Sequence, residues 1–219
     1  MRNTVAYYEA RAAFGFTAVV PALLPPVFGF IVLVNWLRNG STPTANEVMS
    51  ALAVLLPLSA ALSAAHLMVV ERDENVDALR RSYAEPTWRL PLIRFSGALL
   101  VAGISIGITI LLLHGAGAAY PLDQIVLPAI PATLMMVCLA LLAGNVTGNS
   151  PAAVVAVIAY WFLDMQTGGK VTGVFFMFNA VSPLEDVDPD LNRFLLYAAA
   201  FGLCFANIAW STRRRRVGG

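Results

Sequence analysis

The chain has 219 residues, of which 58% are hydrophobic and 12% are charged, and its formal net charge is +1. Soluble domains carry about 25% charged residues, so this composition leaves too little polar surface to face water. It therefore excludes an ordinary soluble protein and indicates a chain whose solvent is mostly lipid. The net charge is too small to indicate a nucleic-acid partner.

Six apolar stretches are long enough to cross a membrane, which takes about 20 mostly apolar residues. They cover Ala13–Leu37, Val48–Val70, Leu92–Leu113, Gln124–Gly144, Asn145–Leu163 and Phe194–Trp210. The fifth is the weakest, because its first turn is polar and its apolar part is short. The apolar segment Val171–Phe178 is too short to span and is expected to form a re-entrant or interfacial helix. We therefore predict an all-α integral membrane protein with one domain over residues 1–219.

The positions of the basic residues predict the orientation, since cytoplasmic loops carry an excess of Lys and Arg. With both termini in the cytoplasm, eleven of the fourteen basic residues lie inside, and Arg38, Lys170 and Arg193 lie outside. The acidic run from Glu185 to Asp190 then also falls outside. Because the chain is rich in alanine and has a single lysine, a bacterial source and the inner membrane are expected.

Prolines and small residues predict how the helices bend and pack. Pro21, Pro25 and Pro26 in the first stretch each remove a backbone hydrogen bond, and together they predict a bent helix. Small residues crowd the second stretch, and Gly103 and Gly107 form a GxxxG pattern in the third. Close helix packing is expected at both places.

Motifs of soluble and membrane enzymes are missing from the sequence. The glycine-rich stretch Gly144–Ser150 has no lysine and cannot cradle a nucleotide phosphate as a P-loop does, and neither GxSxG nor HExxH occurs. His66 and His114 are expected near opposite ends of neighbouring spans. Asp164 and Arg94 are expected near span ends, where long side chains reach the membrane surface. A proton-coupled transporter or ion channel, which needs charges inside the spans, is therefore disfavoured.

The loop between the second and third apolar stretches is the most informative part of the sequence. Its acidic residues come first and its arginines follow, which suits the dipole of a short helix. Val76, Leu79 and Tyr83 recur at helical spacing, and Pro86 ends the pattern. A short amphipathic helix over Asp73–Tyr83 is therefore expected in the cytoplasm. It is either a docking helix for a cytoplasmic subunit or a solvated loop that follows the charge bias.

This loop resembles the E-x-E-x-G-T-L-E-x-L-L-x-x-P pattern of type-2 ATP-binding-cassette permeases. Glu71 and Asp73 match its two acids, Asn75 stands where glycine is usual, and Pro86 follows at an approximately matching distance. The layout of the whole chain is also similar to that of the family. It offers an amphipathic N-terminal helix over Thr4–Ala12, six spans, a coupling helix after the second span and a short re-entrant segment before the last.

The resemblance implies the permease subunit of an ATP-driven exporter. Two membrane subunits, the same chain or a homologous one, would form the pathway, and separate cytoplasmic ATPase subunits that hold ATP and Mg would drive it. The chain itself would be no enzyme and hold no cofactor. Coupling to the ATPase would fall to Glu71, Asp73, Glu74, Asp77, Leu79, Arg80 and Arg81. The family's second and fifth spans line the pathway, so an outer gate would fall to Tyr160, Trp161, Phe175, Phe176 and Phe178, which could equally be ordinary interface aromatics.

Two other functions fit the composition. A membrane-embedded enzyme, such as a lipid-modifying hydrolase, needs polar groups that converge in the bilayer, and the sequence is poor in them. A non-transporting scaffold or accessory subunit shares the expected fold and differs only in a transport assay. If the chain does transport a substrate, the shortage of buried charge favours a lipid-like or amphipathic one.

Overall fold

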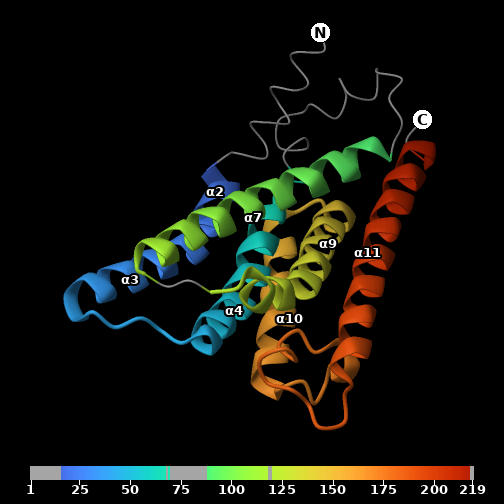
Figure 1. Ribbon diagram of the computed structural model, residues 1–219. Helices are drawn as coiled ribbons and strands as arrows, with labels where there is room; N and C mark the ends of the chain where they lie inside the picture. Colours follow the sequence, from blue (N-terminus) through green and yellow to red (C-terminus); the bar gives the residue numbers. More distant parts are fainter. Residues whose placement is uncertain (1–15, 68, 70–87, 118–119, 218–219) are drawn as a thin grey trace.

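The computed structural model describes residues 16–67, 69, 88–117 and 120–217, and every regular element in these ranges is helical. Figure 1 shows their arrangement. The α-helices are α2 (Phe16–Ala22), α3 (Leu24–Asn39), α4 (Ala45–Ala64), α7 (Arg89–Gly115), α8 (Leu122–Ile125), α9 (Ile130–Thr147), α10 (Ser150–Thr167) and α11 (Pro189–Val217). Two 3-10 turns, η1 (Leu127–Ala129) and η2 (Gly173–Phe175), complete the described elements.

Five stretches of the described residues are long and apolar enough to cross a membrane. They are Ala18–Asn39, Ala45–Ala64, Arg89–Gly115, Asp123–Thr147 and Pro189–Arg213. The predicted all-helical fold is thus confirmed for the described ranges, and five of its stretches have the length and composition of membrane spans. The sixth span and the orientation remain predictions. The predicted helices Thr4–Ala12 and Asp73–Tyr83 lie outside the described residues.

The fifth predicted span corresponds to α10, which is not among these five stretches. Its last turn contains Asp164 and Gln166, and both lower its mean hydropathy. The predicted boundary between the fourth and fifth spans is also wrong. Asn145 still belongs to α9, and the break comes at Gly148, whose left-handed backbone (φ 66°) ends that helix.

The first span is bent where its prolines predict. The helix is interrupted at Leu23, between α2 and α3, and resumes with Pro25 and Pro26 in its first turn. A proline in the first turn of a helix removes only a donor that has no helical partner there. The break therefore divides one span into two helices, α2 and α3.

Helix α9 occupies the centre of the bundle. It contacts α4, α10 and α11, and Figure 1 shows it between α4 (teal) and α11 (red). Its core side chains, which include Met136 and Leu141, pack against Ala60 and Ala64 of α4 and Ala153 of α10 in one cluster. The small residues of α4 are buried as predicted, because they allow α9 to approach closely.

The close helix approach that was expected at the GxxxG pattern occurs instead at Gly29, between α3 and α7. A side-chain carbon added at Gly103 or Gly107 would meet nothing within 4 Å, so these glycines make no close contact with the described residues. At Gly29 of α3 the same carbon would lie 3.2 Å from the Thr109 carbonyl oxygen and from Cβ of Leu112 on α7. The predicted packing role of GxxxG within this chain is therefore wrong, and Gly29 provides the contact.

Candidate functional site

The segment between α10 and α11, residues 168–188, folds back onto the helices that it joins. We call it the connecting segment. In Figure 1 it lies at the end of α11 that is far from the C-terminus. The re-entrant helix predicted over Val171–Phe178 is wrong in detail, because the segment forms turns around the short η2. Its centre is nevertheless buried: Phe176, Met177, Phe178 and Asn179 all lie in the interior.

Aromatic rings from α10 and the connecting segment meet in this region. Trp161 and Phe178 pack edge to face with ring centroids 6.5 Å apart, and Phe176 and Phe178 do the same at 5.8 Å. The hydroxyl of Tyr160 donates to the carbonyl of Phe175 at 3.1 Å. The five residues predicted as an outer gate thus form two interacting sets, Trp161–Phe178–Phe176 and Tyr160–Phe175, which are neighbours along the chain. We call the five together the aromatic cluster. Phe175 is its most exposed member, whereas Phe176 and Phe178 are buried.

Trp161 also joins the cluster to α4. Its indole N–H donates to the carbonyl of Val54 at 3.3 Å. Three residues further along, Pro57 lies inside α4, and a proline there leaves the carbonyl of Ala53 without its helical donor. The contact therefore falls beside the turn of α4 in which proline removes one helical hydrogen bond.

A buried aspartate holds the connecting segment in place. Asp164 is 0% exposed, so the prediction that its side chain reaches the membrane surface is wrong. One carboxylate oxygen accepts from the hydroxyl of Thr172, and the other accepts from the backbone N–H of Met177 at 2.7 Å. Because both oxygens accept hydrogen bonds from the segment, the carboxylate fixes its path. Sequence reasoning missed this role, since its partners are a hydroxyl and a backbone group rather than a charged residue.

Two asparagines and a glycine complete the anchoring. The Asn192 side chain of α11 donates to the carbonyls of Val174 at 2.7 Å and Phe176 at 3.0 Å. Asn179 accepts from the backbone N–H of Leu184 at 2.9 Å. Gly169 has φ +79°, and a side-chain carbon there would lie 2.6 Å from Cγ of Phe176. The segment therefore needs glycine at this position for both conformation and space.

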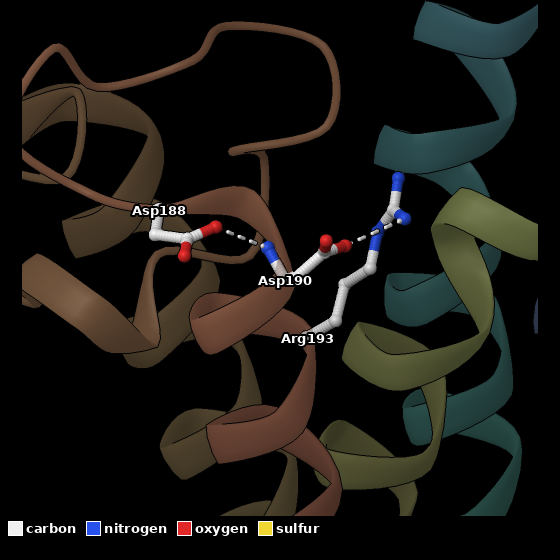
Figure 2. A network of polar contacts seen from close by, with 3 residues as sticks. All are labelled: Asp188, Asp190 and Arg193. Atoms are coloured by element: carbon white, nitrogen blue, oxygen red, sulfur yellow. Dashed lines mark hydrogen bonds and ion pairs between the residues drawn. The ribbon is translucent and has the colours of Figure 1, made fainter.

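Charged groups near the start of α11 remain at the surface. Figure 2 shows Asp188 accepting from the backbone N–H of Asp190 at 2.9 Å, which caps the helix, and Asp190 paired with Arg193 at 3.5 Å. Asp190 is 90% exposed in this pair, so it contributes little stability. Two residues of the predicted acidic run, Asp188 and Asp190, thus serve the helix start, and the aromatic cluster contains no charged residue.

The other predicted residues lie elsewhere. The coupling residues Glu71, Asp73, Glu74, Asp77, Leu79, Arg80 and Arg81 fall outside the described ranges. Arg94 is 3% exposed and donates to the carbonyl of Leu67 after α4, so its predicted surface position is wrong. Among the described residues, no group of three His, Cys, Asp or Glu side chains could hold a metal ion.

Comparisons of the chain with protein-family models, with curated proteins and with solved structures gave no match.

Proposed function

We propose that this chain is the membrane subunit of an exporter driven by a separate ATPase, and that the aromatic cluster closes its pathway on the outer side. The observation that carries the proposal is the connecting segment. Before the last long apolar helix, the chain turns back into the protein and buries Phe176 and Phe178 against its own helices. The resemblance to type-2 ATP-binding-cassette permeases implies a short re-entrant segment at this place.

The chemistry of the cluster suits a gate for an apolar or amphipathic substrate. A constriction lined by apolar rings excludes water and ions when it is closed. Asp164 and Asn192 hold the backbone behind the rings, so the rings are positioned without a charged side chain among them. An amphipathic molecule can displace such rings without leaving a charge unpaired.

Helix α4 supplies the connection to the energy source in this proposal. Its C-terminal end leads into residues 70–87, where the sequence predicts the coupling helix, and its middle contacts the cluster through Trp161 and the Val54 carbonyl. Movement of the loop by the ATPase would shift α4 at Pro57 and act on Trp161. The two ends of the pathway would then open and close together.

The proposal is tested by purifying the tagged chain in mild detergent from its own host and assaying ATP hydrolysis. We expect a nucleotide-binding ATPase subunit to accompany the parent chain. The triple variant D73A/E74A/D77A should lose this subunit, because it removes three of the acids expected to contact it. The matched control D123A/E185A/D186A removes the same charge from exposed positions elsewhere and should retain it.

Two results would contradict the proposal. If the parent chain never brings down an ATPase, the scaffold interpretation takes its place, and substrate turnover by the purified chain alone would favour the enzyme. If both triple variants lose the ATPase equally, its binding depends on net charge rather than on the coupling loop.

A further inference from the structure

Helix α11 continues beyond its apolar part, and the continuation is strongly basic. The membrane-spanning stretch ends at Arg213, whereas the helix runs to Val217. Arg213, Arg214, Arg215 and Arg216 fill four consecutive positions of this helix. Consecutive residues of an α-helix are about 100° apart, so these positions are distributed around most of the helix rather than along one side.

Helix α11 packs against α9 on one side, and most of the surface of its apolar part faces away from the chain's other helices. Only 17% of its apolar window is buried inside the protein, the lowest share among the five spanning stretches. Phe194, Phe201 and Phe205 are each between 67% and 76% exposed. In a membrane these side chains face lipid acyl chains, so helix positions 213–216, which follow the apolar part, fall at the level of the lipid headgroups.

Two tryptophans mark the same level of the membrane. Trp210 is 37% exposed and comes one turn before the arginines, and Trp88 is 51% exposed and immediately precedes α7. Helices α7 and α11 are in contact, and in Figure 1 the first turn of α7 lies toward the same end as the last turn of α11. Exposed tryptophan is enriched at the boundary between lipid tails and headgroups.

We propose that this end of the protein, formed by Trp88, Trp210 and Arg213–Arg216, binds the headgroups of anionic phospholipids. A guanidinium matches the phosphate group in geometry as well as charge. A protein partner docks on one side of a helix, whereas lipid headgroups surround the helix end, which suits basic positions that are distributed around it. The inference does not depend on the exporter proposal.

The test uses the full purified chain in mild detergent, with equal amounts of phosphatidylglycerol and phosphatidylcholine added. Native mass spectrometry measures how much of each lipid stays bound. Because one arginine near an anionic surface strengthens binding about fivefold, we expect the parent to retain at least about fivefold more phosphatidylglycerol. The variant R213Q/R214Q/R215Q/R216Q should retain the two lipids almost equally.

A matched variant separates position from net charge. R2Q/R38Q/K170Q/R193Q also removes four positive charges, all elsewhere in the chain, and should keep the parent's preference. A thermal unfolding curve for each variant verifies that it is folded. Inorganic phosphate, added in place of lipid, should leave the melting temperature of the parent unchanged.

The proposal would be overturned by a parent without lipid preference, by an arginine variant that keeps the preference, or by a matched variant that loses it equally. Stabilisation of the parent by phosphate as strong as that by phosphatidylglycerol would also overturn it, because the site would then be a general anion site.

Discussion

The hydroxyl of Ser105 in α7 donates a hydrogen bond of 2.5 Å to the carbonyl of Ala22, at the break between α2 and α3. This carbonyl would accept from the backbone N–H of residue 26 in a continuous helix, but Pro26 has none. A neighbouring helix thus supplies the donor that the proline removes, as an apolar environment requires. The bend of the first span is therefore built jointly by the prolines and by α7.

Replacing Ser105 with alanine should destabilise the protein by about 1–3 kcal/mol, because it leaves a buried carbonyl without a donor. The change is measured as a loss of melting temperature in detergent. In the double variant S105A/P26A the cost should be smaller, since alanine at position 26 restores the backbone donor. The control S96A removes an exposed hydroxyl that bonds within α7 and should have little effect. Equal losses for S105A and S96A would contradict the prediction.

Replacing Asp164 with asparagine should loosen the connecting segment. Asparagine keeps the size of the side chain but removes its charge: its oxygen can still accept from the Met177 N–H, and its amide can donate to the Thr172 hydroxyl. Hydrogen bonds to a charged group are worth about 1.5–3 kcal/mol, against about 0.5–1.5 kcal/mol for neutral ones, so the bond that holds Met177 is weakened. We expect faster hydrogen exchange at the Met177 amide. The control D186N changes an exposed carboxylate and should leave this exchange as it is, and an unchanged rate in D164N would refute the anchoring role.

Replacing Trp161 with phenylalanine should weaken the link between the aromatic cluster and α4. The ring remains, but the indole N–H that donates to the Val54 carbonyl is lost, at a cost of about 0.5–1.5 kcal/mol. Hydrogen exchange should rise both in residues 54–58 of α4 and in residues 176–179. The control W210F changes an indole on the exposed side of α11. If exchange rises in only one of the two regions, the cluster and α4 are not coupled.

The sequence predicts the long helices well, because their signal is the continuous apolar stretch that the membrane itself requires. The bend at Leu23 was also predictable, since three prolines act locally on their own backbone. The boundary between α9 and α10 was not, because residues 144–148 contain two glycines and either could end a helix. The choice of Gly148 depends on Asn145, which is buried and donates to Asn207 of α11 at 2.6 Å.

The aromatic cluster was predictable in membership but not in geometry. Its five residues lie close together in the sequence and near one end of a span, so their grouping follows from chain connectivity. The roles of Asp164 and Asn192 depend on backbone groups of a segment without regular structure, and no spacing rule indicates such bonds. Sequence reasoning therefore expected a surface carboxylate where the structure has a buried one.

The packing of glycines is also not predictable from the sequence alone, and it can be tested by comparing the variants G29A and G103A. A GxxxG pattern indicates that two small residues share a face of a helix, but it does not indicate which element packs against that face.

The variant G29A places a carbon 3.2 Å from the Thr109 carbonyl oxygen and from Cβ of Leu112, which is closer than ordinary van der Waals contact. Thr109 and Leu112 must then yield by a few tenths of an ångström, and overpacking of this kind costs about 1–3 kcal/mol, which offsets the gain in helix preference. G103A meets nothing within 4 Å and should be neutral or stabilising, since alanine favours the helix by about 1 kcal/mol. Melting temperatures of the two variants should therefore shift in opposite directions or differ by several degrees. A larger loss in G103A would instead mean that the GxxxG face packs against another molecule in the membrane.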